Sequence, residues 1–106
     1  MSGKKSSFSL GANIAQACHA ASAAILKSNG SSNTVEFAAS LEDMTVCVLS
    51  VEDEFELTQM GEVFSLNHVP FYLWLEKPEN IPTALATAPF PKETVFPLVR
   101  HLKLLR

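Results

Sequence analysis

Gln16 and His19 stand three residues apart in a stretch that otherwise consists of apolar or small residues. If this stretch is helical, the spacing places both side chains on one face of the helix. Polar groups on such a face need hydrogen-bond partners or a site to serve. Two interpretations stay open at this point: a hydrogen-bonded pair at the helix edge, and a functional face.

A set of cationic side chains near the C-terminus has the chemistry to contact phosphate groups. Its members are Lys92, Arg100, His101, Lys103 and Arg106. Arg100 and Lys103 again stand three residues apart, so on a helix they would share a face. The helix dipole also favours cations near a helix C-terminus. A solvated surface is therefore the alternative to phosphate binding.

Residues 75–80 are expected to form a loop between two strands, and its carboxylates Glu76 and Glu79 are candidate general bases. Carboxylates on loops are more often simply solvated, so an ordinary surface loop is the competing interpretation. Trp74 is the only tryptophan and lies in the middle of the preceding strand. That position favours a place in the core over a role as a stacking platform.

The first half of the chain contains the patterns of two helices and a strand. Residues 12–26 include seven alanines and neither proline nor glycine, which predicts a helix with a small, closely packing face. Residues 34–41 predict a second, short helix. Residues 45–50 (TVCVLS) are rich in β-branched residues and almost continuously apolar. This pattern predicts a strand that is buried on both faces.

A third helix is expected after Ser50, which can cap it ahead of acidic residues that suit a first turn. The apolar stripe of this helix consists of Phe55, Met60, Val63 and Phe64. Residues 71–75 and residues 83–87 predict two further strands.

The C-terminal segment has the apolar spacing of a fourth helix. The residues that this helix is expected to bury are Val95, Leu98, Val99, Leu102 and Leu105. Pro97 interrupts the pattern because a proline ring clashes with the preceding turn. The helix therefore either begins late, with Thr94 as its cap, or kinks at Pro97. The order helix, short helix, strand, helix, strand, strand, helix predicts an α/β fold with a sheet that is at least partly antiparallel.

The composition is that of a single globular domain. The chain has 106 residues, of which 47% are hydrophobic and 18% charged, and its formal net charge is -3. These values exclude wholesale disorder and a generally basic nucleic-acid coat protein. We expect residues 1–9 to be a loose tail and residues 10–106 to form one domain.

The sequence also lacks the patterns of membrane, secretory and metal-binding proteins. No apolar run approaches the roughly 20 residues of a membrane-spanning helix, and the N-terminus has no apolar segment of a secretory signal. Cys18 and Cys47 show no C-x-x-C or Cys/His ligand spacing. We therefore expect neither a metal nor a cofactor, no membrane partner, and two reduced cysteines in a cytoplasmic protein.

Several segments, in order along the chain, resemble the type II peptidyl-tRNA hydrolases of archaea and eukaryotes. Residues 11–21 (GANIAQACHAA) look like the first-helix motif of that family, which reads approximately G-K-x-A-A-Q-C-x-H-A. Residues 87–93 (TAPFPKE) and 101–105 (HLKLL) look like its ending, and residues 51–54 (VEDE) like its junction between a strand and a helix. Residues 73–81 (LWLEKPENI) are similar to a divergent branch, the peptidyl-tRNA hydrolase domain-containing proteins.

The resemblance implies an α/β fold with a small mixed sheet of four strands and helices on both faces. It also implies hydrolysis of the ester bond between a peptide and the 3′ ribose of tRNA. Gln16 and His19 fall on the family's glutamine and histidine. By resemblance, Gln16 donates to a carbonyl or ribose oxygen, and His19 orients or exchanges a proton near the ester. The residues implied to contact the tRNA backbone are Lys92, Arg100, His101 and Lys103.

The sequence departs from the family pattern at the site. Ala12 takes the place of the family's lysine, and the family's D-A-G-x-T-Q segment has no equivalent. Glu76 and Thr83 are the candidates to replace its acid and a threonine. These departures make a catalytically impaired pseudo-enzyme, which binds tRNA or protein, the alternative to a hydrolase.

A second departure concerns the sheet. The family opens with a buried strand ahead of the helix that carries the glutamine and histidine, and residues 1–9 do not resemble that strand. A sheet without it has an open edge, because the backbone groups along that edge lack partners. We therefore expect a homodimer or a strand borrowed from a partner.

Overall fold

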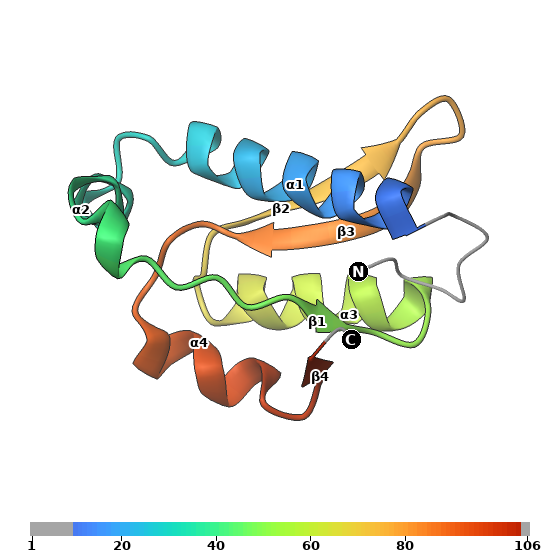
Figure 1. Cartoon of the computed structure of the whole chain (residues 1–106). Coiled ribbons are helices and arrows are strands. Elements are labelled where there is room, and N and C mark those ends of the chain that lie inside the picture. Colours follow the sequence, from blue (N-terminus) through green and yellow to red (C-terminus); the bar gives the residue numbers. More distant parts are fainter. Residues whose placement is uncertain (1–9, 105–106) are drawn as a thin grey trace.

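A computed structural model describes residues 10–104 of the chain, so the expected tail at residues 1–9 and the burial of Leu105 lie outside the described residues. The elements along the chain are α1 (Leu10–Lys27), α2 (Ser32–Ala39), the short 3₁₀ helix η1 (Leu41–Asp43), β1 (Leu49–Ser50), α3 (Glu54–Leu66), β2 (Phe71–Glu76), β3 (Ile81–Thr87), α4 (Lys92–Val99) and β4 (Lys103–Leu104). Figure 1 shows how they are arranged.

The central layer is the antiparallel hairpin of β2 and β3, which runs from the pair Phe71 and Thr87 to the pair Glu76 and Ile81. Helix α1 covers one face of this hairpin and α3 covers the other (Figure 1). The α/β class with helices on both faces is therefore confirmed. Where a mixed sheet was expected, the described strands form two separate antiparallel pairs, β1 with β4 and β2 with β3.

Alternation along the strands assigns residues to these two faces. Phe71 and Leu85 lie beside Gly61 of α3, whereas Trp74 contacts α1. The face of α1 that lies against the hairpin includes Gln16, Ala20 and Ala24, all buried and spaced four residues apart. Because two of these three side chains are single methyl groups, the helix can lie close to the strands.

The apolar core lies between the hairpin, α3 and α4. Met60, Phe64 and Val69 form its buried centre, and the α4 residues Val95 and Leu98 pack against it. Val63 and Val99 pack there as well, which agrees with the expected apolar faces of both helices, and Leu102 packs there from beyond the end of α4. Phe55 does not belong to this stripe, since it lies in the first turn of α3 and is 70% exposed.

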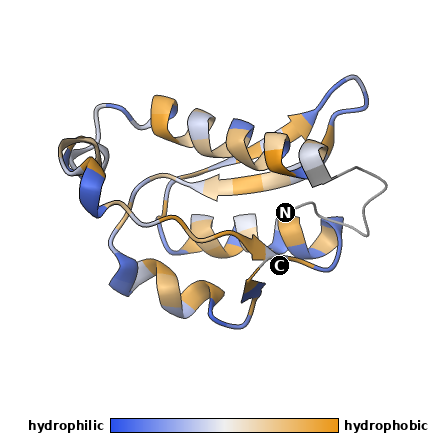
Figure 2. Ribbon diagram, viewed as in Figure 1, coloured by the Kyte–Doolittle hydropathy of each residue, from blue (hydrophilic) through white to orange (hydrophobic). Residues whose placement is uncertain are grey.

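The strand expected at residues 45–50 is wrong in extent and in burial. Only Leu49 and Ser50 form a ladder, in which they pair with Leu104 and Lys103 of β4. Val46 is 70% exposed and Val48 is 41% exposed, and Figure 2 shows the approach to β1 as a hydrophobic segment. A continuous apolar run is buried only when strands and helices surround it, and no strand of the described residues pairs with residues 45–48.

Two helix boundaries also differ from the expectation. Asp53, rather than Ser50, caps α3, because its carboxylate accepts a hydrogen bond of 2.9 Å from the Glu56 amide. Helix α4 starts at Lys92, so Thr94 is not its cap and Pro97 lies inside the helix. The missing N–H of Pro97 removes one helical hydrogen bond, and the helix ends at Val99, well before Leu105.

Two further observations complete the description of residues 10–104. None of the helices there has the length and apolar content needed to cross a lipid bilayer. Cys18 and Cys47 are both exposed, free thiols.

Candidate active site

Gln16 is buried on the hairpin face of α1, with only 4% of its surface exposed. Its side-chain oxygen Oε1 is also buried and has no protein hydrogen-bond partner. A buried amide oxygen without a partner costs free energy, so it is rare in folded proteins. Gln16 therefore lies against the hairpin rather than at the helix edge, and its Oε1 accepts no hydrogen bond from His19.

Thr83 on β3 carries a second buried oxygen without a partner. The register of the hairpin shifts between Trp74, which pairs with Ala84, and Leu75, which pairs with Pro82. Thr83 is thus the extra residue of a β-bulge, a feature that re-aims side chains. Its side chain is 3% exposed, and its buried Oγ1 has no protein partner.

His19 lies one turn beyond Gln16 on α1 and is exposed, but one face of its ring is covered. The imidazole stacks on the indole of Trp74, with ring centroids 4.6 Å apart and an angle of 19° between the ring planes. Trp74 is half-buried and does not belong to the core cluster around Met60 and Phe64. The expectation that Trp74 is a core residue is therefore wrong, because its ring is a stacking platform for His19.

Glu76 completes this arrangement. The indole N–H of Trp74 donates a hydrogen bond of 2.9 Å to Oε1 of Glu76. The two residues are separated by one position on β2, so they point to the same face of the hairpin. Glu76, Trp74 and His19 consequently form a continuous chain of contacts from the hairpin to α1.

The four residues proposed from the sequence as catalytic come from three elements that pack on one another, α1, β2 and β3. Gln16 and His19 come from the helix, and Glu76 and Thr83 come from the two strands. Glu79 lies outside this group, as an exposed residue of the turn between the strands. The sequence could have predicted that Trp74 and Glu76 lie side by side, because residues two positions apart on a strand point to the same face.

The cationic residues form a separate surface. Lys92 begins α4, Arg100 and His101 follow its end, and Lys103 lies in β4; all four are exposed. The expected helical face shared by Arg100 and Lys103 is absent because α4 ends at Val99. Helix α4 packs on the α3 side of the hairpin, whereas His19 lies on the α1 side (Figure 1).

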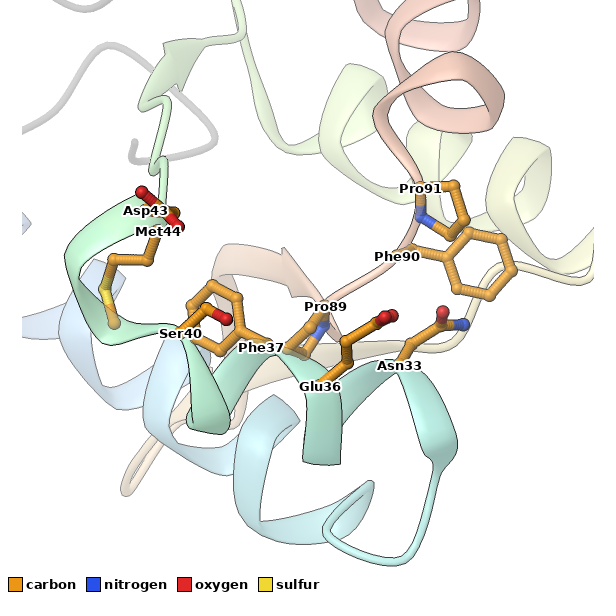
Figure 3. Close-up of a pocket in the computed structure, with 9 residues that line it drawn as sticks. All are labelled: Asn33, Glu36, Phe37, Ser40, Asp43, Met44, Pro89, Phe90 and Pro91. Carbon is orange, nitrogen blue, oxygen red and sulfur yellow. The ribbon is translucent and has the colours of Figure 1, made fainter.

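A surface pocket of about 410 Å³ lies between α2 and the connection from β3 to α4. Figure 3 shows the aromatic rings of Phe37 and Phe90 and the carboxylates of Glu36 and Asp43 among its lining. None of the four candidate catalytic residues lines this pocket. Among the residues described, no three His, Cys, Asp or Glu side chains come together as metal ligands.

Comparison with known proteins gives two concordant results. A family model described as "Peptidyl-tRNA hydrolase PTH2" matches residues 4–105 of the chain. The human and mouse proteins named "Putative peptidyl-tRNA hydrolase PTRHD1" are each 37% identical to it over 100 residues. These alignments cover 94% of this chain and 71% of each relative. Both matches therefore span α1, the hairpin and α4.

The buried hydroxyl of Thr83 generates a stability prediction. Thr83→Val keeps the shape of the side chain but removes an oxygen that has no protein partner. We expect the free energy of unfolding to rise by about 1 kcal/mol, because the cost of burying that oxygen disappears. Urea denaturation measures this change.

Thr34 is the matched control for this substitution. It is 4% exposed, like Thr83, but its hydroxyl shares a hydrogen bond of 2.8 Å with the Ser28 hydroxyl. Thr34→Val should therefore lower the free energy of unfolding by about 1 kcal/mol. Equal losses of stability in both variants would contradict the assignment of Thr83 Oγ1 as unpartnered.

Proposed function

Because the chain belongs to the peptidyl-tRNA hydrolase PTH2 family, we propose that it hydrolyses the ester bond between a peptide, or an N-blocked amino acid, and tRNA. The observation that carries the proposal is the pair of unpartnered buried oxygens, Gln16 Oε1 on α1, the helix that also holds His19, and Thr83 Oγ1 on β3. Buried polar atoms are normally paired. Two that are not paired support a site whose hydrogen bonds are completed when substrate binds.

Hydrolysis of an ester requires an attacking water, a group that takes its proton, and donors for the oxyanion that develops. In our proposal the amide N–H of Gln16 donates to the carbonyl or ribose oxygen, and Gln16 Oε1 and Thr83 Oγ1 accept hydrogen bonds from the bound substrate. The neutral imidazole of His19 takes the water proton as the oxygen attacks the carbonyl carbon. The bond to the ribose O3′ then breaks, and the proton passes to O3′, which leaves a free peptide acid and tRNA.

The exposure of His19 fits this substrate. A peptidyl-tRNA is far too large for an enclosed cavity, so the group that exchanges the proton must be accessible at the surface. The nitrogen atoms of His19 lie at the edge of a ring whose stacked face is occupied by Trp74. An ester can therefore approach these nitrogens without displacing the indole.

The competing function is a protein that binds tRNA without hydrolysing it. Ala12 favours this function, because it takes the place of the lysine in the motif that the first helix resembles. A lysine can stabilise developing negative charge, and an alanine cannot. A turnover assay distinguishes the two functions, because only a hydrolase releases the peptide from tRNA.

The surface formed by Lys92, Arg100, His101 and Lys103 is our proposed contact for the tRNA backbone. None of these side chains makes an ion pair with another described residue, so their charges are available to phosphates. Since this surface lies on the α3 side of the hairpin and His19 on the α1 side, the single-stranded 3′ end of the tRNA would have to bend around the hairpin.

We also propose that the protein acts in the cytoplasm, where translation supplies its substrate, and that it forms a homodimer. The argument for the dimer is the exposed apolar segment at residues 44–48, which no strand of the described residues covers. An unpaired extended segment of this kind is a template for a strand from a second copy. A strand borrowed from another protein is the alternative occupant.

The hydrolase proposal predicts the release of an N-acetylated amino acid from N-acetyl-aminoacyl-tRNA. Gln16→Ala and His19→Ala should each lower kcat by about a hundredfold, because each removes a group that acts in the transition state. Gln59→Ala, on α3 and away from the site, is the matched control and should leave kcat unchanged. If the wild-type protein releases nothing at high enzyme concentration, the protein is a binding module.

The tRNA-binding surface predicts a salt-dependent effect of charge reversal. The double variant Arg100→Glu and Lys103→Glu should weaken tRNA binding about tenfold or more at low salt. It should also reduce the dependence of log Kd on log salt concentration by about one unit for each phosphate that the variant no longer binds. Lys27→Glu is the control, because it reverses one charge in the same way but at the end of α1, away from this surface. Unchanged affinity in the double variant would contradict the assignment of this surface.

The proposed dimer predicts a change in oligomeric state. The wild-type protein should sediment as a dimer whose fraction rises with concentration, and Val46→Lys should shift it to monomer, because a charge in the interface is costly. Leu66→Lys is the control, since Leu66 is also apolar and 79% exposed but lies on α3. A monomer at every concentration would contradict the dimer.

A further inference from the structure

Glu76 does not have the contacts of a free general base. We infer that Glu76 and Trp74 are positioning residues: Glu76 holds the indole of Trp74, and the indole fixes the imidazole of His19 for proton exchange. On this inference Glu76 acts as a hydrogen-bond acceptor for Trp74 and takes no proton from the attacking water. The inference rests on the hydrolysis proposed above, and it assigns distinct roles to two residues of that site.

The first step is the bond between Glu76 and Trp74. An indole N–H can only donate, and a carboxylate is a strong acceptor. The 2.9 Å bond from Trp74 Nε1 to Glu76 Oε1 is the hydrogen bond that this N–H makes. Trp74 is half-buried, and the bond selects one orientation among the rotamers open to a tryptophan on a strand.

The second step is the space that the indole occupies. Ala84, which is 3% exposed, lies opposite Trp74 in the hairpin, and Ala20 on α1 is completely buried. Because both neighbours are small, the indole can lie between strand and helix without lifting α1 away. The small residues therefore leave space for the indole of Trp74, and the hydrogen bond to Glu76 fixes its orientation.

The third step is the effect on His19. An exposed histidine on a helix surface has several rotamers of similar energy. Stacking at 4.6 Å on the indole favours the rotamer in which the two rings are nearly parallel. A stack uses ring faces and leaves both nitrogens free at the ring edge. No hydrogen bond joins either nitrogen of His19 to another described residue, so both can serve the substrate and the water.

Two substitutions at Glu76 separate a positioning role from that of a general base. Glu76→Gln keeps an oxygen that can accept from Trp74 but removes the carboxylate, whereas Glu76→Ala removes the acceptor. We expect kcat for N-acetyl-aminoacyl-tRNA to stay within about threefold of wild type in Glu76→Gln and to fall by about tenfold to a hundredfold in Glu76→Ala, since small displacements of catalytic groups have effects of this size. Equal losses in both variants would overturn the inference, because the carboxylate itself would then be required.

A double variant tests whether Glu76 acts through Trp74. Trp74→Phe keeps an aromatic face for His19 but lacks the indole N–H. Adding Glu76→Ala to Trp74→Phe should therefore change kcat by less than about twofold, because the contact that links the residues is already absent. If the second substitution lowers kcat as much as it does in the wild-type background, the inference fails.

NMR spectroscopy provides a readout that does not depend on activity. The chain has one tryptophan, so its indole N–H gives a single cross-peak. This peak should shift upfield in Glu76→Ala and change little in Glu76→Gln, and the ring-current shift of the His19 protons should be lost only in Glu76→Ala. If the wild-type protein hydrolyses nothing, the proposed function fails, and these spectra still decide the inferred positioning. Unchanged indole and His19 resonances in Glu76→Ala would overturn it.

Discussion

The close packing of α1 on the β2–β3 hairpin is the contact on which the candidate site depends. Ala20 and Ala24 make this packing possible, because methyl groups let the helix lie near the strands. The same closeness isolates Gln16 Oε1 from solvent and brings His19 onto Trp74. A larger residue at either alanine would separate the helix from the hairpin and remove both features. Apolar packing and the proposed chemistry therefore share one interface.

The two unpartnered oxygens, Gln16 Oε1 and Thr83 Oγ1, lower the stability of the folded protein. A buried polar atom without a partner destabilises the folded state, and a domain of this size has little free energy of folding to spare. The core between α3, α4 and the hairpin has to offset that cost, and it does so with Met60, Phe64 and Val69 on the opposite side of the strands. The site lies on one face of the hairpin, and the main apolar cluster lies on the other.

Local patterns predicted the elements well, but they could not predict contacts that depend on neighbours. The alanines of α1 and the apolar spacing of α3 and α4 identify helices from the sequence alone. Residues 45–48 have a strand pattern, yet their pairing depends on strands elsewhere, and none of the described residues supplies one. The bulge at Thr83 depends on the register of two strands, and the stack on Trp74 depends on the placement of α1. Spacing and motif resemblance both pointed to Gln16 and His19, whereas the stack of His19 on Trp74 depends on how the helix packs on the hairpin.

The exposure of His19 has a consequence for selectivity. In the proposed mechanism His19 exchanges a proton at an open surface that does not surround a small molecule. A simple ester would therefore gain little binding energy there. Catalysis on such a surface depends on binding energy from parts of the substrate far from the reacting bond. The distance between the proposed tRNA-binding surface at α4 and His19 on α1 would then select the substrate. Only an ester at the end of a nucleic acid that contacts both sides of the hairpin would be bound productively. Indiscriminate esterase activity would be avoided by the openness of the site itself.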